Sequence, residues 1–297
     1  IAMKKIIQYI VITIIGALPF SLQAQMGQAY EMMVNGVKVI VQPSGNEIVV
    51  VQTIIKGGVE NYAANKAGIE SLAFTALTEC GTTKDDKNNF KNKLDKVSAQ
   101  MYGSSNMDYG NFSMNCIKGD FENVWPLYTA ALTTPAFNAK EFDRIKQDAI
   151  TNIRANESNP DAAIDKMAMQ TAFTGKNYAK DPAGSVETVT ALTATATKAY
   201  WQSIFTKSRL VIVIVADLER KIIEEKVKEL LAKVPAGTPF KSTKSSYTPT
   251  TNSFKPSQRE NATNYVQGIT SGPQPGSPDF NAFVLAMRIF SNKHFIE

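Results

Sequence analysis

The sequence predicts an α+β fold in which an antiparallel-rich sheet is covered by helices. Short segments near the start of the chain alternate apolar and polar residues with the period of two that is typical of strands. From Asn65 onwards the apolar residues recur with a helical period of about 3.6. A β-branched run at Leu210–Ala216 then returns to strand character between helical stretches. Strands and helices are therefore mixed within one unit, as in helices layered on a sheet.

The first residues have the composition of a secretory signal peptide. Lys4 and Lys5 precede an apolar run from Ile6 to Phe20, and small residues follow up to Ala24. The run is shorter than the roughly 20 residues that cross a bilayer, so we expect cleavage after Ala24 rather than a permanent anchor. The sequence thus predicts residues 1–24 as the signal peptide of an exported protein, periplasmic or extracellular, that meets the membrane only through this segment.

Three strands are expected before the first helix. An Asn-Gly pair separates the apolar segments Glu31–Val34 and Val37–Gln42, which is a strong hairpin signal. Ile48–Ile55 is apolar along most of its length and is predicted to be an inner strand. An alternative is that this strand lies at an edge, because the two glycines that follow it would let another backbone come close.

The next elements alternate between helix and strand. Apolar residues from Ile69 to Leu77 fall on one helical face, and the helix is expected to end near Gly81. Asp217 is expected to cap a helix that follows the β-branched strand. The remaining predicted helices and strands are Asn89–Ser98, Met101–Tyr102, Asn111–Ile117, Phe121–Leu132, Phe142–Ile153, Asp161–Phe173 and a helix from about Val186 to Phe205.

A change of composition follows the first domain, which is expected over residues 28–234. Residues 235–256 contain four prolines among Ser, Thr and Lys and are predicted to be an interdomain linker. Beyond it, a strand at Asn264–Thr270, a Gly/Pro loop and a helix at Phe280–Phe290 repeat the strand, glycine, helix order of the first domain. Residues 257–297 are therefore predicted to be the truncated start of a second homologous domain.

Charge and cysteine content exclude several function classes. The net charge is +5, but acidic residues are interspersed and no dense Lys/Arg block is present, so a nucleic-acid partner is not expected. Cys80 and Cys116 have no Cys or His neighbour at metal-ligand spacing. Whether the two thiols pair or stay free and buried is left open.

Several short motifs occur in an order that resembles the M16 peptidases, the pitrilysin or insulinase family. This resemblance implies the M16 peptidase-like fold for both domains. The motifs are Gly57-Gly58-Val59-Glu60, Asn65-Lys66-Ala67-Gly68-Ile69, Gly81-Thr82, Asn159-Pro160-Asp161, Phe173-Thr174-Gly175, Asp181-Pro182-Ala183-Gly184 and Ala216-Asp217.

Catalytic members carry the motif H-x-x-E-H on the first helix. Its two imidazoles bind Zn²⁺ and its glutamate takes a proton from the metal-bound water. Counting forward from the glycine before the helix places Ser71, Phe74 and Thr75 at these positions. Counting back from the following Gly-Thr pair places Leu72, Thr75 and Ala76 there instead. Neither register supplies a ligand or a base.

The third zinc ligand of the family aligns near Thr151 or Asn152, and the only histidine is His294, near the end of the sequence. The resemblance therefore implies a non-catalytic member with no catalytic residue, no zinc and no other cofactor. Hydrolysis through Ser71 or Cys80 is disfavoured, because neither has a base in register to activate it.

The resemblance also implies partners. In two-chain members, a metal-free subunit helps a zinc-bearing paralogue to enclose a peptide or unfolded polypeptide. The residues expected to contact the peptide are Ile54, Lys56, Gly57 and Gly58, if their strand accepts another strand at its edge. The alternative function is a peptide-binding or scaffold protein of an envelope complex without associated proteolysis.

Overall fold

The computed structural model describes residues 27–243, 254–260 and 263–294. The predicted signal peptide and the middle of the predicted linker lie outside the described residues. Within the described part of the chain, no helix is both long enough and apolar enough to cross a bilayer.

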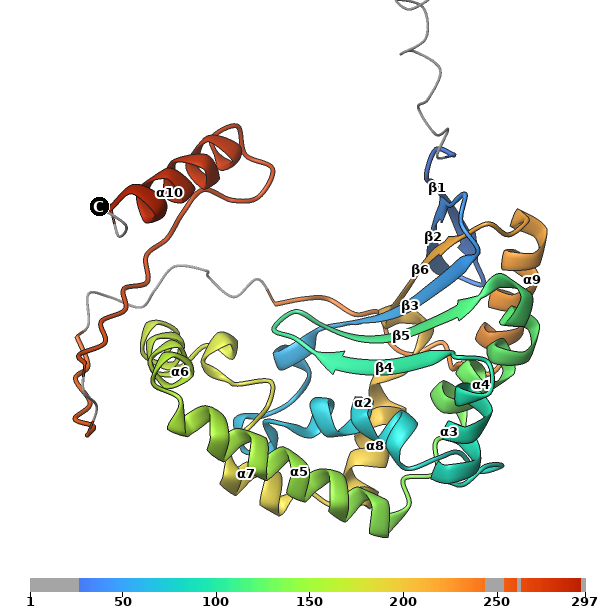
Figure 1. Ribbon diagram of the computed structural model, residues 1–297, viewed down its shortest axis with the longest axis horizontal. Coiled ribbons are helices and arrows are strands. Elements are labelled where there is room, and N and C mark those ends of the chain that lie inside the picture. Colours follow the sequence, from blue (N-terminus) through green and yellow to red (C-terminus); the bar gives the residue numbers. More distant parts are fainter. Residues whose placement is uncertain (1–26, 244–253, 261–262, 295–297) are drawn as a thin grey trace, which may run out of the picture.

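A six-stranded mixed sheet forms the centre of the fold (Figure 1). Its strands lie in the order β1-β2-β6-β3-β5-β4, and every neighbouring pair is antiparallel except β2 and β6. This arrangement confirms the predicted antiparallel-rich sheet. The strands are β1 (Tyr30–Val34), β2 (Val37–Pro43), β3 (Ile48–Lys56), β4 (Gln100–Ser105), β5 (Tyr109–Ile117) and β6 (Leu210–Ala216).

Helices cover one face of this sheet, as predicted (Figure 1). Alternate residues of the central strands, such as Val51, Phe112 and Ile212, are fully buried under them. The described helices are α2 (Ile69–Glu79), α3 (Lys87–Asp95), α4 (Phe121–Thr133), α5 (Ala139–Ser158), α6 (Pro160–Ala172), α7 (Val186–Ala191), α8 (Ala194–Ile204), α9 (Arg220–Leu231) and α10 (Phe280–His294), of which α10 lies apart from the sheet (Figure 1).

The predicted hairpin and two helix predictions can be compared directly with the structure. β1 and β2 are joined at Asn35, whose φ is 46°, as expected for an Asn-Gly turn. The helix expected from Val186 to Phe205 is divided into α7 and α8, because Thr193 leaves the helical conformation and caps α8 through its side chain. Asp217 does not cap α9, since the N-cap is Glu219 and the Asp217 carboxylate pairs with Lys118.

The face of the sheet opposite the helices is only half-buried. One row across it runs through Ile40, Val213, Gln52, Ser113 and Tyr102, according to the strand register. In this row, aliphatic side chains stand on β2 and β6, and Gln52, Ser113 and Tyr102 on β3, β5 and β4 are uncharged and carry polar groups.

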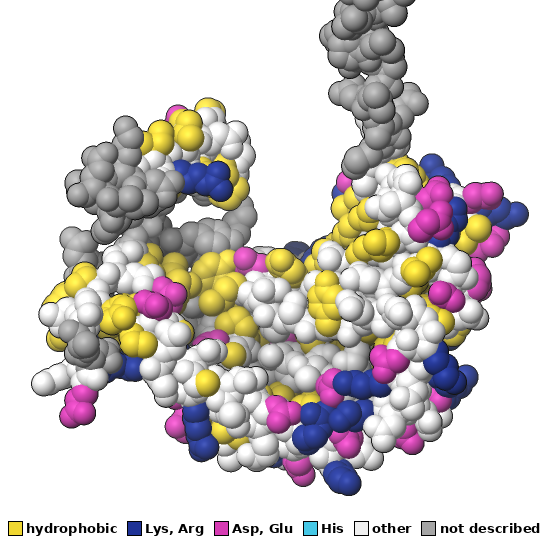
Figure 2. All heavy atoms as spheres, in the orientation of Figure 1, with side chains coloured by type: hydrophobic (Ala, Val, Ile, Leu, Met, Phe, Trp, Pro, Cys, Tyr) yellow, Lys and Arg dark blue, Asp and Glu magenta, His cyan; other side chains and the backbone are white. Residues whose placement is uncertain are grey.

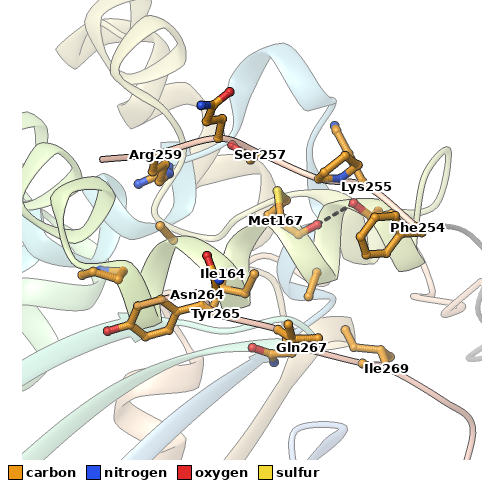
Figure 3. Close-up of a pocket in the computed structure, with 18 of the residues that line it drawn as sticks. Ile164, Met167, Phe254, Lys255, Ser257, Arg259, Asn264, Tyr265, Gln267 and Ile269 are labelled. Carbon is orange, nitrogen blue, oxygen red and sulfur yellow. Dashed lines mark hydrogen bonds between the residues drawn. The ribbon is translucent and has the colours of Figure 1, made fainter. Parts of the chain in front are cut away.

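The C-terminal region differs from the prediction. The helix expected at Phe280–Phe290 is present as α10, but Asn264–Thr270 is extended without pairing to any described strand. A strand needs a neighbour to satisfy its backbone groups, and this segment pairs with none of the described strands. It lies beside α6 instead, and side chains of both surround a cavity of about 850 Å³ (Figure 3).

Candidate functional site

The positions of the degenerate zinc motif lie on α2. Ser71 and Thr75 are half-buried on the same side of the helix, and the Thr75 hydroxyl donates to the Ser71 carbonyl at 2.9 Å. Thr78 extends this side by one turn, and its hydroxyl points back to the Thr75 carbonyl at 3.4 Å. We call Ser71, Thr75 and Thr78 the hydroxyl stripe. Its side chains carry no charge at neutral pH.

Counted forward from Gly68, Phe74 stands where a catalytic member has its general base. The ring is fully buried and meets Trp201 of α8 edge-on, with 5.4 Å between the ring centroids. Gly103 of β4 and Gly110 of β5 leave the room for it, because a Cβ at Gly110 would lie 2.1 Å from the ring. The position has thus become part of the core and offers no proton acceptor.

The residues at the metal positions do not fit zinc. Thr151 and Asn152 are exposed on α5, and the Thr151 hydroxyl donates to the Gln147 carbonyl at 3.0 Å. Zinc sites in proteins use imidazole, thiolate or carboxylate groups, whereas these positions provide hydroxyl and amide groups. Within the described ranges, no group of three or more His, Cys, Asp and Glu residues is placed to hold a metal ion.

The predicted peptide contacts on β3 are not at an edge. Ile54 pairs with Asn111 of β5 and with Val211 of β6, so its strand is an inner strand, as the apolar run predicted. The alternative of an edge at this strand is therefore wrong. Lys56, the last residue of the strand, pairs with Tyr109 of β5.

The two glycines after β3 serve an internal contact. The Gly57 N–H donates to the Asp108 carbonyl at 2.8 Å, which joins the β3 exit to the β4–β5 turn. A Cβ at Gly58 would lie 2.4 Å from the carbonyl oxygens of Asn106 and Met107. Close backbone approach does occur here, as the glycines predicted, but the approaching backbone belongs to the same chain.

The free edge next to α2 is β4. Within the described residues β4 pairs only with β5, and α2 packs beneath it. The Asn106 N–H donates to the Tyr109 carbonyl at 2.9 Å and closes the β4–β5 hairpin. Because pairing alternates along an antiparallel ladder, the backbone groups of Met101, Gly103 and Ser105 are directed to the open edge.

Sequence reasoning missed Glu70, which is fully buried on α2. Its carboxylate accepts hydrogen bonds from the side chains of Tyr200 at 2.5 Å, Asn61 at 3.1 Å and Ser105 at 3.1 Å. Burial raises the pKa of Glu70, while these three donors and the Arg209 charge act in the opposite direction. A carboxylate on the same helical side as two apolar residues, four and seven positions later, was the available signal.

Both cysteines are free and buried, which answers the question left open by the sequence. Burial raises the pKa of the Cys80 thiol to about 12 and that of the Cys116 thiol to about 11. At neutral pH both are protonated and therefore poor nucleophiles. This argues against Cys80 as the nucleophile of a hydrolytic reaction.

Two family models match the chain, and together they cover most of it. The model for insulinase, peptidase family M16, matches residues 39–184, and the model for the peptidase M16 inactive domain matches residues 191–295. A comparison with curated proteins found no match. The predicted domain division at residue 234 stays a prediction.

Solved structures with a similar fold include an M16 inactive domain and two proteases. A peptidase M16 inactive domain from Pseudomonas fluorescens is 19% identical with a TM-score of 0.69, and the match covers 75% of this chain and 54% of that one. A protease from Helicobacter pylori is 15% identical with a TM-score of 0.65, and the match covers 74% of this chain and 53% of that one. The periplasmic protease PqqL from Escherichia coli is 13% identical with a TM-score of 0.65, and the match covers 73% of this chain and 25% of that one.

The match thus spans about half of the first two structures and about a quarter of the third. At these identities the likeness concerns the fold. In the register counted forward from Gly68, the positions of the zinc motif hold a hydroxyl pair and a buried ring. With the two family models matching in sequence order, the chain belongs to the M16 (insulinase) peptidase family, and its residues 191–295 match the model of the family's inactive domain.

Proposed function

We propose that this protein is an exported, non-catalytic M16 subunit that binds extended peptides by strand addition at β4 and works beside a zinc-bearing M16 partner. The observation that carries the proposal is the unpaired edge of β4 next to the helix on which catalytic relatives hold zinc. A peptide bound there would lie where a catalytic relative holds its scissile bond.

The composition of β4 supports this proposal. The strand reads Gln-Met-Tyr-Gly-Ser-Ser and contains neither a charged residue nor a proline. Natural proteins block exposed sheet edges with lysine, proline, bulges or a covering element, because an open edge recruits other strands. An edge without such protection beside a family's catalytic helix is expected to receive a strand as part of its function.

The surroundings of β4 favour recognition of the peptide backbone over recognition of its side chains. Side chains of an added strand alternate between the two faces of the sheet. On the open face they would meet Gln100, Tyr102 and Ser104, which are exposed. On the helical side they would approach the hydroxyl stripe. These groups are uncharged, so we expect little discrimination by peptide charge.

Cleavage is assigned to a partner, since the described residues provide no group of His, Cys, Asp and Glu placed to hold a metal, and a buried ring occupies the general-base position of the forward count. The similar structures include a protease and an inactive domain, so the fold occurs in proteins with both descriptions. The predicted signal peptide and the periplasmic location named for PqqL support export.

Fluorescence anisotropy with a labelled unstructured peptide tests the strand-addition step. Met101→Pro removes one backbone N–H directed to the free edge, and we expect the affinity to fall about tenfold, because one charge-free hydrogen bond and the local fit of the peptide are lost. Met33→Pro is the matched control. Met33 is exposed on the opposite edge strand, β1, where its N–H is also directed outward, and this variant should bind as the unchanged protein does.

Equal affinities for the two variants, or no peptide binding by the unchanged protein, would contradict the proposal. The partner is tested separately by co-purification from the source cells. A co-purifying M16 chain with an intact H-x-x-E-H supports the subunit role. Recovery of envelope proteins without any peptidase would favour the scaffold function instead.

A further inference from the structure

The carboxylate of Glu70 joins three segments of the chain at one end of β4. Ser105 is the last residue of β4, Asn61 closes the short helix η1 (Gly58–Asn61), and Tyr200 lies on α8. All three donate to Glu70, and each comes from a separate element. The side chain therefore links three separate elements through direct hydrogen bonds.

A second layer of contacts extends this cluster. The Arg209 guanidinium, in the short helix η5 (Lys207–Arg209) before β6, donates to the Asn61 side-chain oxygen at 2.6 Å. It also approaches the Lys56 carbonyl, at 3.4 Å, at the end of β3. The hydrogen bonds thus run from the β4 edge through Glu70 to β3 and β6, two inner strands of the sheet.

The cluster is tightly packed. A Cβ at Gly110 would lie 3.0 Å from one carboxylate oxygen of Glu70, and a Cβ at Gly57 would lie 2.1 Å from the Asn61 side chain. Side-chain movement that would compensate for a weaker bond is therefore restricted. A change at Glu70 is expected to pass directly to Ser105 and to the β4–β5 turn.

We infer that ionised Glu70 is a positioning residue that fixes the end of the β4 edge in the geometry needed to pair with a peptide. This inference rests on the proposed function, because the edge is the proposed binding site. Glu70 itself is fully buried and does not touch the peptide. It acts through Ser105, whose backbone groups are directed to the open edge.

The inference includes a pH dependence. The titratable groups around Glu70 are Tyr200 from α8, Arg209 from η5 and Tyr62, whose ring meets that of Tyr200 and lies beneath the Lys180 ammonium. Burial raises the pKa of Glu70, so the carboxylate takes up its proton at a higher pH than an exposed glutamate does. The neutral acid is a weaker acceptor for the three donors, and its hold on Ser105 weakens.

Hydrogen exchange and peptide affinity, measured from neutral pH downward, test this inference. We compare the unchanged protein with Glu70→Gln, which stays neutral at every pH and keeps the side-chain size. Glu79→Gln is the control, because it removes a partly buried carboxylate at the other end of the same helix, where Lys91 and Arg144 bind it.

At neutral pH, we expect Glu70→Gln to lower the protection of the Ser104 and Asn106 amides about tenfold and to weaken peptide binding by a similar factor, as the loss of charge-assisted bonds predicts. The unchanged protein should approach the same values as the pH falls, whereas Glu70→Gln should show no such change. Glu79→Gln should follow the unchanged protein.

Equal protection of these amides in Glu70→Gln and the unchanged protein, or the same pH profile in both, would overturn the inference. The two proposals can fail separately. Loss of protection in Glu70→Gln together with no peptide binding by any form would leave the positioning role intact and reject the proposed function. Peptide binding that is the same in Glu70→Gln and the unchanged protein would reject the positioning role and leave the proposed function intact.

Discussion

The two edge strands of the sheet, β1 and β4, differ in how they are protected against pairing with another strand. At β1, the Glu31 carboxylate pairs with Lys38 at 2.7 Å, α9 packs against the strand, and the Arg220 guanidinium lies over the Tyr30 ring at 5.1 Å. At β4 there is no charged residue, and α2 lies beneath the strand without covering its edge. One edge is protected against pairing, and the other is left open.

This difference supports β4 as the proposed binding site. A protein that only needed to avoid aggregation would protect both edges, because either one can recruit a foreign strand. The protected edge lies away from α2, whereas the open edge lies on the helix that carries zinc in catalytic relatives. The absence of zinc ligands at the motif and the open edge at β4 are consistent with a protein that binds peptides and does not cleave them.

Charged side chains of both signs are mixed on the face of the molecule that Figure 2 shows. Figure 2 shows Lys and Arg interspersed with Asp and Glu on the outer side of the helices, without a continuous basic patch. That nucleic acid is not the partner stays a prediction.

The largest expected effect comes from removing the support beneath the open edge. Phe74→Ala leaves a cavity between α2, Trp201 and the glycines of β4 and β5, and we expect the free energy of unfolding to fall by about 3–5 kcal/mol. Urea unfolding followed by circular dichroism measures this loss. Phe74→Leu keeps most of the volume and serves as the control. A loss below about 1 kcal/mol for Phe74→Ala would show that the ring does not support the edge.

An effect of intermediate size is expected from changing the peptide rather than the protein. N-methylation of single peptide bonds removes one donor at a time, and only every second position of an added strand faces β4. We therefore expect affinity to fall about tenfold at alternate positions and to stay unchanged between them, in an anisotropy titration. A uniform loss, or no loss at any position, would indicate recognition by side chains instead of strand pairing.

The smallest effect is expected at the protected edge. Glu31→Gln removes a surface ion pair whose side chains are 46% and 58% exposed, so we expect the free energy of unfolding to change by less than about 1 kcal/mol, and less still at high salt. The protection should weaken nonetheless, and sedimentation at increasing concentration measures any self-association. A stability loss comparable to that of Phe74→Ala would contradict the view that this pair serves to guard the edge.

Much of the fold could be predicted from local patterns in the sequence. The Asn-Gly hairpin, the inner strand at Ile48–Ile55 and the helix from Ile69 are present, because turn chemistry and apolar periodicity act over a few residues. The absence of the motif's two histidines, with Ser71 and Thr75 at their positions in the forward count, could also be predicted directly from the sequence. The strand expected at Asn264–Thr270 is not formed, since local strand propensity alone provides no pairing partner.

The sequence by itself determined the family, the replacement of the zinc motif and the order of the elements. Only the tertiary structure decided that β4, and not β3, is the open edge, and that the Glu70 carboxylate is held by Tyr200, which is 130 residues away in the chain. The physical reason is that periodicity reports which side of an element is buried, whereas strand order and the partners of a buried charge depend on contacts between segments far apart in sequence.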